Sequence, residues 1–111
     1  MEIQFRNAKL QKLCNSAKKL RGEYGTRMAA LIQQRLMELA AAEVLADMRF
    51  IVGARCHELA QNFNGHLAVD LVHPDRLVFR PSVRQPPRKP DGGLDWDQVT
   101  SIEVVGIGDY H

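Results

Sequence analysis

The first half of the chain shows one short strand pattern followed by two helical stripes. Residues 2–5 alternate polar and apolar side chains, which is the period of a half-buried strand. Asn7 then offers a helix N-cap, and apolar residues recur at helical spacing up to Gly22, where we expect the first helix to end. A longer stripe after Gly25-Thr26 predicts a second helix, antiparallel to the first. Its members are Met28, Leu31, Ile32, Arg35, Leu36, Leu39 and Ala42.

After about residue 48 the pattern changes to that of strands and turns. Residues 55–59 are a candidate short strand. Residues 66–72 and 76–80 are apolar runs on either side of the turn-forming His73-Pro74-Asp75, a pattern typical of a β-hairpin. Residues 100–107 have the β-branched composition of a final strand.

A proline-containing loop, Pro81–Gly93, separates the hairpin from the final strand, and Trp96 is expected to anchor its far end to the core. The order of elements predicts a single α+β domain over residues 1–111. It has an N-terminal strand, a two-helix hairpin and then a largely antiparallel sheet of about four strands. The helices are expected on one face of the sheet.

Composition points to an ordinary globular domain without a cofactor. The 111 residues fit one domain, and no apolar run approaches the ~20 residues that cross a bilayer. The first residues lack the apolar region of a signal peptide, so we expect a cytoplasmic protein with no membrane partner. Cys14 and Cys56 are not in metal-ligand spacing, and we interpret both as buried small hydrophobes. We expect neither a metal nor a cofactor.

The charges are unevenly distributed along the chain. Residues 1–90 hold 15 basic and 8 acidic side chains, a balance of +7, whereas residues 91–111 hold five acidic side chains and no Lys or Arg, a balance of −5. A basic body suits a polyanionic partner such as RNA. A solvated surface of mixed charge is equally compatible with these numbers, so the charge distribution alone does not distinguish an RNA-binding surface from an ordinary solvated one.

Three segments of the predicted strands stand out as Arg55-Cys56-His57-Glu58-Leu59, Ala68-Val69-Asp70-Leu71 and Pro74-Asp75-Arg76-Leu77-Val78-Phe79. They resemble the central hairpin of the HigB-like killer proteins of the RelE/ParE toxin superfamily. Gly92-Gly93-Leu94-Asp95-Trp96 and the terminal Asp109-Tyr110-His111 resemble it as well. Because the order of strand, two helices and strands also matches, the resemblance covers nearly the whole chain and implies a RelE-like fold.

The resemblance implies a type II toxin: a metal-independent, ribosome-dependent mRNA endonuclease that a HigA-like helix-turn-helix antitoxin neutralises. The ribosome and mRNA are then its partners. The implied catalytic residues are His57, Arg76, Asp109, Tyr110 and His111. The chain departs from shorter members in two places. Leu59-Ala60-Gln61 stands where they carry a lysine after the histidine, and the Pro81–Gly93 loop is longer.

These residue types suit RNA cleavage by the adjacent 2′-hydroxyl. The reaction needs a proton acceptor, a proton donor and compensation of negative charge. His57 and His111 can transfer protons near neutral pH, and Arg76 can hold two phosphate oxygens at once. Tyr110 can stack on a base or donate its hydroxyl, and Asp109 can orient His111 or accept a hydrogen bond.

Each candidate also has a structural interpretation. A histidine or tyrosine of this kind can cap the core, and an arginine or aspartate can simply lie on the surface. Arg80 is predicted on the same sheet face as Arg76, and Arg55 on the same face as His57, so both are further candidates for RNA contacts. Two other functions fit the same fold: a gyrase-poisoning toxin without nuclease activity, and a non-toxic RNA- or protein-binding module.

Overall fold

The computed structural model describes residues 1–110 and contains five strands, three α-helices and four short 3₁₀ turns. The strands are β1 (Glu2–Phe5), β2 (His57–Glu58), β3 (Leu67–Asp70), β4 (Arg76–Pro81) and β5 (Ser101–Gly108). The helices are α1 (Ala8–Cys14), α2 (Ala17–Tyr24) and α3 (Thr26–Ala41). The 3₁₀ turns are η1 (Leu45–Phe50), η2 (Val52–Ala54), η3 (Gln61–Phe63) and η4 (Trp96–Gln98).

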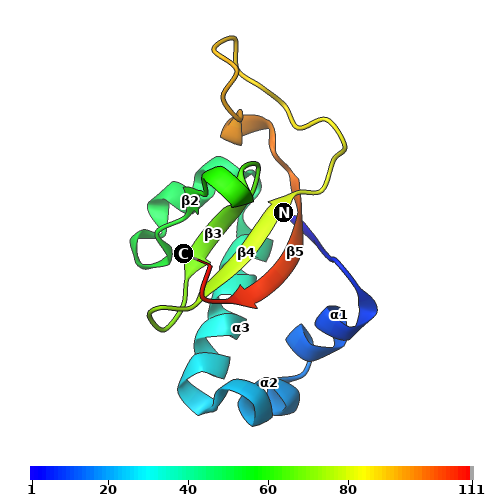
Figure 1. The fold of residues 1–111 in the computed structure, drawn as a ribbon, viewed down its shortest axis with the longest axis vertical. Helices are drawn as coiled ribbons and strands as arrows, with labels where there is room; N and C mark the ends of the chain where they lie inside the picture. The colour runs from blue at the N-terminus through cyan, green and yellow to red at the C-terminus, as the bar shows by residue number, and fades with distance from the viewer. Residues whose placement is uncertain (111) are drawn as a thin grey trace.

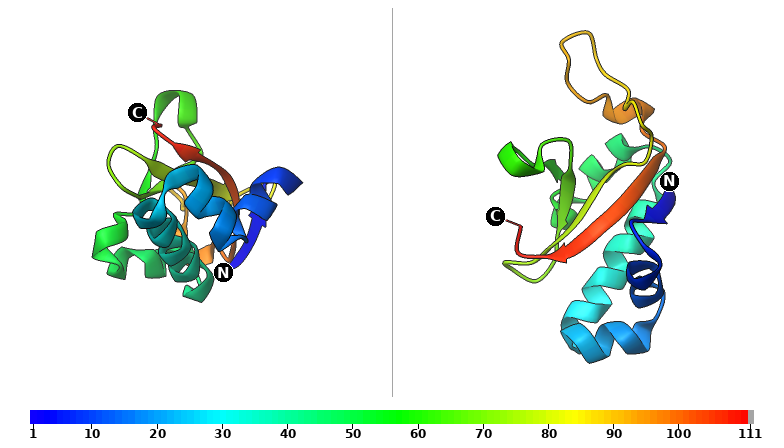
Figure 2. Two further views of the ribbon diagram at one scale, coloured as in Figure 1. Left: turned by 90° about the horizontal axis from the view of Figure 1, so that it is seen from below. Right: turned by 45° about the vertical axis from the view of Figure 1, so that its right-hand side comes forward.

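The strands form one sheet in the order β1-β5-β4-β3-β2. β1 runs parallel to β5, and the other three pairs are antiparallel. The helices lie on one face of the sheet, and the loop between β4 and η4 extends away from the body (Figures 1 and 2). The predicted α+β fold is confirmed; the sheet has five strands once the N-terminal one is counted. None of the helices within residues 1–110 is long and apolar enough to cross a membrane.

Strand alternation divides the sheet into a helix-covered face and an open face. The helix-covered face carries the main core, in which strand residues pack against buried Leu20, Ile32 and Leu39. Those strand residues are Leu67, Val69, Leu77, Phe79, Ile102 and Val104. A second, smaller cluster of buried Ala68, Val78 and Val105 lies on the opposite side of the same strands. We call this side the open face.

The predicted first helix is wrong in its extent, because the chain breaks it into α1 and α2. The Asn7 cap is confirmed, since its side-chain oxygen accepts a hydrogen bond from the Leu10 N–H at 2.9 Å. Ser16 then caps a new helix by accepting from the Lys19 N–H at 3.1 Å. Gly22 lies inside α2, which ends before Gly25. Gly25 has a φ of +83°, a conformation that glycine adopts without strain.

The strands of the second half follow the predicted pattern, with one exception. The hairpin and the final strand are confirmed as β3, β4 and β5. The candidate strand over residues 55–59 is reduced to His57–Glu58, because Arg55 takes a left-handed φ of 44° where η2 ends. Trp96 is buried as expected, and its indole N–H donates to Glu58 at 3.1 Å.

The two thiols differ in their surroundings. Cys14 is buried, as expected, whereas Cys56 is only half-buried and precedes the short strand β2. Desolvation raises the pKa of Cys14 to about 11 and the pKa of Cys56 to about 12. Both groups are therefore uncharged thiols at neutral pH, and a thiol is a poor nucleophile.

Arg35 is the one charged side chain within residues 1–110 that is buried, and it joins three elements. Its guanidinium donates to the Asp70 carbonyl at the end of β3 at 2.8 Å and to the Gly53 carbonyl in η2 at 2.8 Å. A third hydrogen bond, of 2.9 Å, reaches the Glu38 carboxylate one turn further along α3. A buried charge is tolerated only when it is paired and hydrogen-bonded, and here it also fixes how α3 meets the sheet.

We expect Arg35→Ala to lower the free energy of unfolding by about 3 kcal/mol or more, because it leaves two carbonyls without their donor and the Glu38 carboxylate without its charged partner. Equilibrium urea unfolding followed by the Trp96 fluorescence measures this. Gln34→Ala, at an exposed position next along α3, is the control and should cost less than about 1 kcal/mol. Equal unfolding midpoints for the two variants would contradict a stabilising role for Arg35.

Candidate functional site

The registers of β2, β3, β4 and β5 align residues of the open face into rows across the sheet. One row runs from His57 through Ala68 and Val78 to Gly106. Neighbouring strands are ~4.8 Å apart, so the two ends of this row are separated by ~14 Å of backbone. The two residues between them, Ala68 and Val78, are fully buried, and Leu59 and Tyr110 pack against them.

A β-bulge on β5 lies at the Gly106 end of this row. Val78 pairs with Gly106 but the next residue, Phe79, pairs with Val104, so Val105 is the extra residue. The bulge resets the alternation: Val105 belongs to the open-face cluster, and Ile107 packs against the main core, although the two share the same parity.

Tyr110 folds back from the end of β5 onto the open face. Its side chain packs against the open-face cluster, where a Cβ at Gly106 would overlap the Tyr110 hydroxyl. The ring meets Phe63 of η3 edge to face, with centroids 5.3 Å apart. Gly106 therefore provides the space that lets Tyr110 lie against β5, and η3 holds the ring from the other side.

Arg76 lies beside Tyr110 and is held by Asp70. Asp70 and Arg76 are partners across the hairpin, and the Arg76 guanidinium lies 3.8 Å from the Asp70 carboxylate. It also donates a long hydrogen bond, of 3.4 Å, to the Tyr110 carbonyl. The Arg76 side chain is only 15% exposed. A guanidinium so well covered is screened less by water than a surface arginine is.

Asp70 binds a second arginine at the same time. Arg55 donates to its two carboxylate oxygens at 2.7 and 3.1 Å. This hydrogen-bonded carboxylate raises the pKa of the Arg55 guanidinium above its usual value. The left-handed backbone of Arg55, which bulky residues rarely adopt, turns its side chain toward Asp70 rather than along a strand. The sequence-based expectation that Arg55 is a strand residue on the His57 face is therefore wrong.

Arg76 and Tyr110 line a hollow of about 190 Å³. Its remaining wall is the segment Leu59–Phe63, which ends in η3. The hollow thus has one guanidinium, one phenol and otherwise uncharged side chains. This combination suits a phosphate with its attached sugar or base, since Arg76 can bind two phosphate oxygens and the ring offers a stacking surface.

His57 lies at the β2 end of the row, outside the hollow that Arg76 and Tyr110 line. Its Nδ1 is 2.7 Å from the Arg55 carbonyl, and a carbonyl only accepts, so Nδ1 carries the proton in this contact. The lone pair of the neutral ring is then on Nε2. Nε2 is free to accept a proton from a bound hydroxyl.

The structure brings some of the predicted residues together and separates others. Asp70 binds Arg55 and faces Arg76, which in turn donates a hydrogen bond to the Tyr110 carbonyl. Arg80 does not join them, because it forms an ion pair with Glu103 at 2.8 Å further along β4.

The remaining predicted positions are at the C-terminus. Asp109 is exposed, and His111 lies outside the described residues. Asp70 and Phe63 were not predicted as site residues; the hairpin register would have revealed Asp70 opposite Arg76, whereas the contact of Phe63 with Tyr110 depends on the tertiary fold.

Within residues 1–110 there is no group of three or more His, Cys, Asp or Glu side chains placed to hold a metal ion. Comparisons of the chain with protein-family models, with curated proteins and with solved structures give no significant match. The site is therefore interpreted from its own geometry.

We expect Gly106→Ala to displace Tyr110 from the open face while the fold persists, since the Gly106 backbone is outside the left-handed region and the obstacle is the end of a side chain. Nuclear Overhauser effects between the Phe63 and Tyr110 rings should weaken strongly. Gly22→Ala, in open space on α2, is the matched control and should leave them unchanged. If the Gly106→Ala protein keeps the full ring-to-ring signal, Gly106 does not position Tyr110.

Proposed function

We propose that this protein is a toxin of the RelE/ParE superfamily, of the HigB-like kind, that cuts mRNA on the ribosome. The observation that carries the proposal is the pairing of Arg76, covered and anchored by Asp70, with Tyr110 in one hollow of the open face. This is a site for a phosphate beside an aromatic ring, and the resemblance in the Asp109-Tyr110-His111 segment supports RNA as its source.

In the proposed reaction the 2′-hydroxyl loses its proton and its oxygen attacks the adjacent phosphorus. The bond from phosphorus to the 5′-oxygen breaks, and this leaving oxygen takes up a proton. The products are a 2′,3′-cyclic phosphate and a 5′-hydroxyl end. Arg76 compensates the negative charge that builds up on the phosphate, which is a common source of large rate effects.

Proton transfer is assigned to the two histidines. His57, with its proton on Nδ1, offers Nε2 as the base for the 2′-hydroxyl. His111 follows Tyr110 in the chain and is the proposed acid for the leaving oxygen, with Asp109 as its orienting group.

The ribosome is proposed to supply what this small site lacks. The chain has no lysine in Leu59-Ala60-Gln61, and its hollow of about 190 Å³ is too small to bend a free RNA strand into the in-line geometry of attack. Correct placement can contribute ~7–11 kcal/mol to lowering a barrier. A ribosome already holds the message in place. The proposed setting is therefore the cytoplasm, and the proposed inhibitor is a HigA-like helix-turn-helix antitoxin.

We expect Arg76→Ala to lower the single-turnover cleavage rate by roughly 10²–10³-fold, the scale for losing one transition-state charge contact. Arg76→Lys should restore only part of this loss, since an ammonium cannot bind two oxygens in the same fork. Arg80→Ala is the matched control on the same strand, and its effect should stay under about tenfold because Glu103 already pairs Arg80. Equal rates for wild type and Arg76→Ala would exclude the phosphate contact.

We expect purified protein to cut mRNA in the decoding site of programmed ribosomes and to cut the same RNA far more slowly when it is free. Mapping the ends of labelled mRNA, with and without ribosomes, measures this, and 5′-hydroxyl ends are the expected signature. Equal cleavage of free RNA would refute ribosome dependence. Absence of cleavage together with inhibited gyrase supercoiling would instead identify a gyrase-poisoning toxin.

A further inference from the structure

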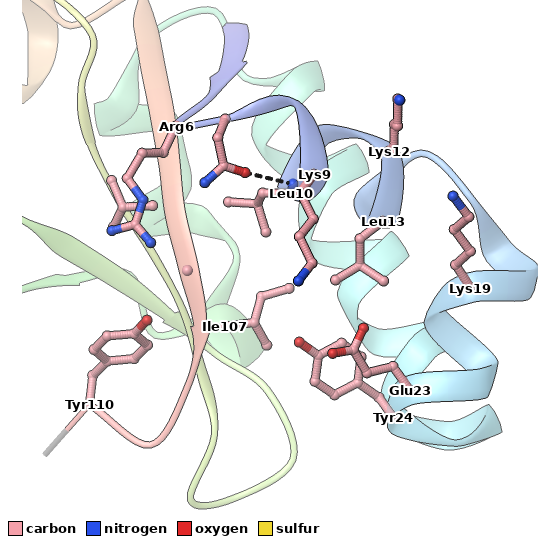
Figure 3. Close-up of a pocket in the computed structure, with 13 residues that line it drawn as sticks. Arg6, Lys9, Leu10, Lys12, Leu13, Lys19, Glu23, Tyr24, Ile107 and Tyr110 are labelled. Atoms are coloured by element: carbon pink, nitrogen blue, oxygen red, sulfur yellow. Dashed lines mark hydrogen bonds between the residues drawn. The ribbon is translucent and has the colours of Figure 1, made fainter.

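A groove of about 560 Å³ lies between α1, α2 and the second half of β5 (Figure 3). β1 pairs with β5 only as far as Val104. The Val104 carbonyl accepts a hydrogen bond from the Arg6 N–H at 2.9 Å. The chain then turns away into α1. Within residues 1–110, Gly106, Ile107 and Gly108 pair with β4 alone and Val105 is the unpaired bulge residue, so the space beside this segment is left open as a groove.

The rim of this groove is strongly basic. It carries four cationic side chains against the single carboxylate of Glu23. The cations are Arg6, Lys9, Lys12 and Lys19. All four are exposed, and none forms an ion pair with the part of the chain that the structure describes. A concentration of unpaired positive charge on one side of a groove attracts a polyanion.

Aromatic and aliphatic side chains form the inside of the groove. Leu10, Leu13 and Ile107 line its apolar part, and Figure 3 shows the Lys9 side chain reaching between α1 and β5. Tyr24 lies on the α2 side and Tyr110 on the β5 side. Rings next to flexible cations are the combination with which proteins bind single-stranded nucleic acids, since every base can stack on a ring and phosphates need only a nearby charge.

Tyr110 lies between the groove and the candidate active site. Its side chain lines both the basic groove and the hollow that contains Arg76. Gly106, which has no side chain, lies against the end of the Tyr110 side chain. The two cavities are therefore neighbours, and an RNA strand whose phosphate is bound by Arg76 would have to pass Tyr110 to reach the basic groove.

We propose that this basic groove is a second RNA-binding site, which holds the single-stranded segment of the message next to the scissile phosphate. Its substrate class rests on the proposed function. The helix lysines bind the phosphates of this segment, and Tyr24 stacks on one of its bases. The site contributes affinity, whereas Arg76 and the groups around it act on the reacting phosphate.

The test measures binding with an RNA that cannot be cut. A fluorescein-labelled RNA of about eight nucleotides, within the usual site size of such grooves, carries 2′-O-methyl groups so that it lacks the attacking hydroxyl. Fluorescence anisotropy is recorded over a range of salt concentrations. The test variant combines Lys9→Gln, Lys12→Gln and Lys19→Gln. The matched control combines Lys18→Gln, Arg21→Gln and Arg27→Gln, three exposed cations outside the groove lining.

We expect the groove variant to bind at least about tenfold more weakly and to reduce the slope of log K against log salt by ~2, since each lost phosphate contact contributes about 0.7. The control should change affinity by less than about threefold. Tyr24→Leu should weaken binding by roughly tenfold through lost stacking, and Tyr24→Phe should retain it. Thermal melts verify that every variant is folded. Equal binding by the two triple variants would overturn the proposal.

The outcomes separate this proposal from the proposed function. Cleavage on ribosomes with equal RNA binding by both triple variants would reject the groove and keep the nuclease. Groove-dependent binding without any cleavage would keep the RNA site and reject the nuclease. The free edge of Val105–Gly108 also suits an acidic peptide that adds a strand. If a labelled poly-glutamate peptide binds in the groove and the RNA does not, the proposal is overturned.

Discussion

The buried guanidinium of Arg35 is the constraint on which the rest of the structure depends. A charge inside the core has to find all its partners, and here they come from α3 itself, from η2 and from the end of β3. The carbonyl that it binds on β3 belongs to Asp70, whose carboxylate binds Arg55 and faces Arg76. The hydrogen bonds of Arg35 on the helix-covered face therefore also fix the backbone of Asp70, and the Asp70 carboxylate positions Arg55 and Arg76 at the candidate site.

The candidate site lies beside the buried cluster of the open face. Ala68 and Val78 are fully buried there, with Leu59 and Tyr110 packed against them, and Gly106 leaves space for the end of the Tyr110 side chain. The η3 turn then supplies the opposite wall of the hollow through Phe63. A larger residue at Gly106 would displace the Tyr110 ring, so the candidate site depends on the missing side chain of Gly106 as well as on Arg76.

Local patterns predicted most of the fold, while the site needed long-range contacts. The alternation of polar and apolar residues located β1, because a strand with one face in the core repeats every two residues. The apolar runs on either side of a turn located β3 and β4, and β-branched composition located β5. The break at Ser16 was missed, since the apolar stripe continues across it. The resemblance selected Arg76 and Tyr110, but it could not reveal that Phe63 packs on the ring, because that contact joins residues 47 positions apart.

The positive charges of this protein fall into two physically different groups. Arg76 is mostly covered and paired with a carboxylate, so in the proposed reaction its charge acts at short range on a phosphate that has displaced water. The lysines of α1 and α2 are exposed and hydrated, so they act at longer range and their effect falls as salt increases. A covered arginine can discriminate between a ground state and a transition state, because its position is fixed before substrate arrives. Mobile surface lysines stabilise both states alike, and their contribution is therefore to binding and not to the chemical step.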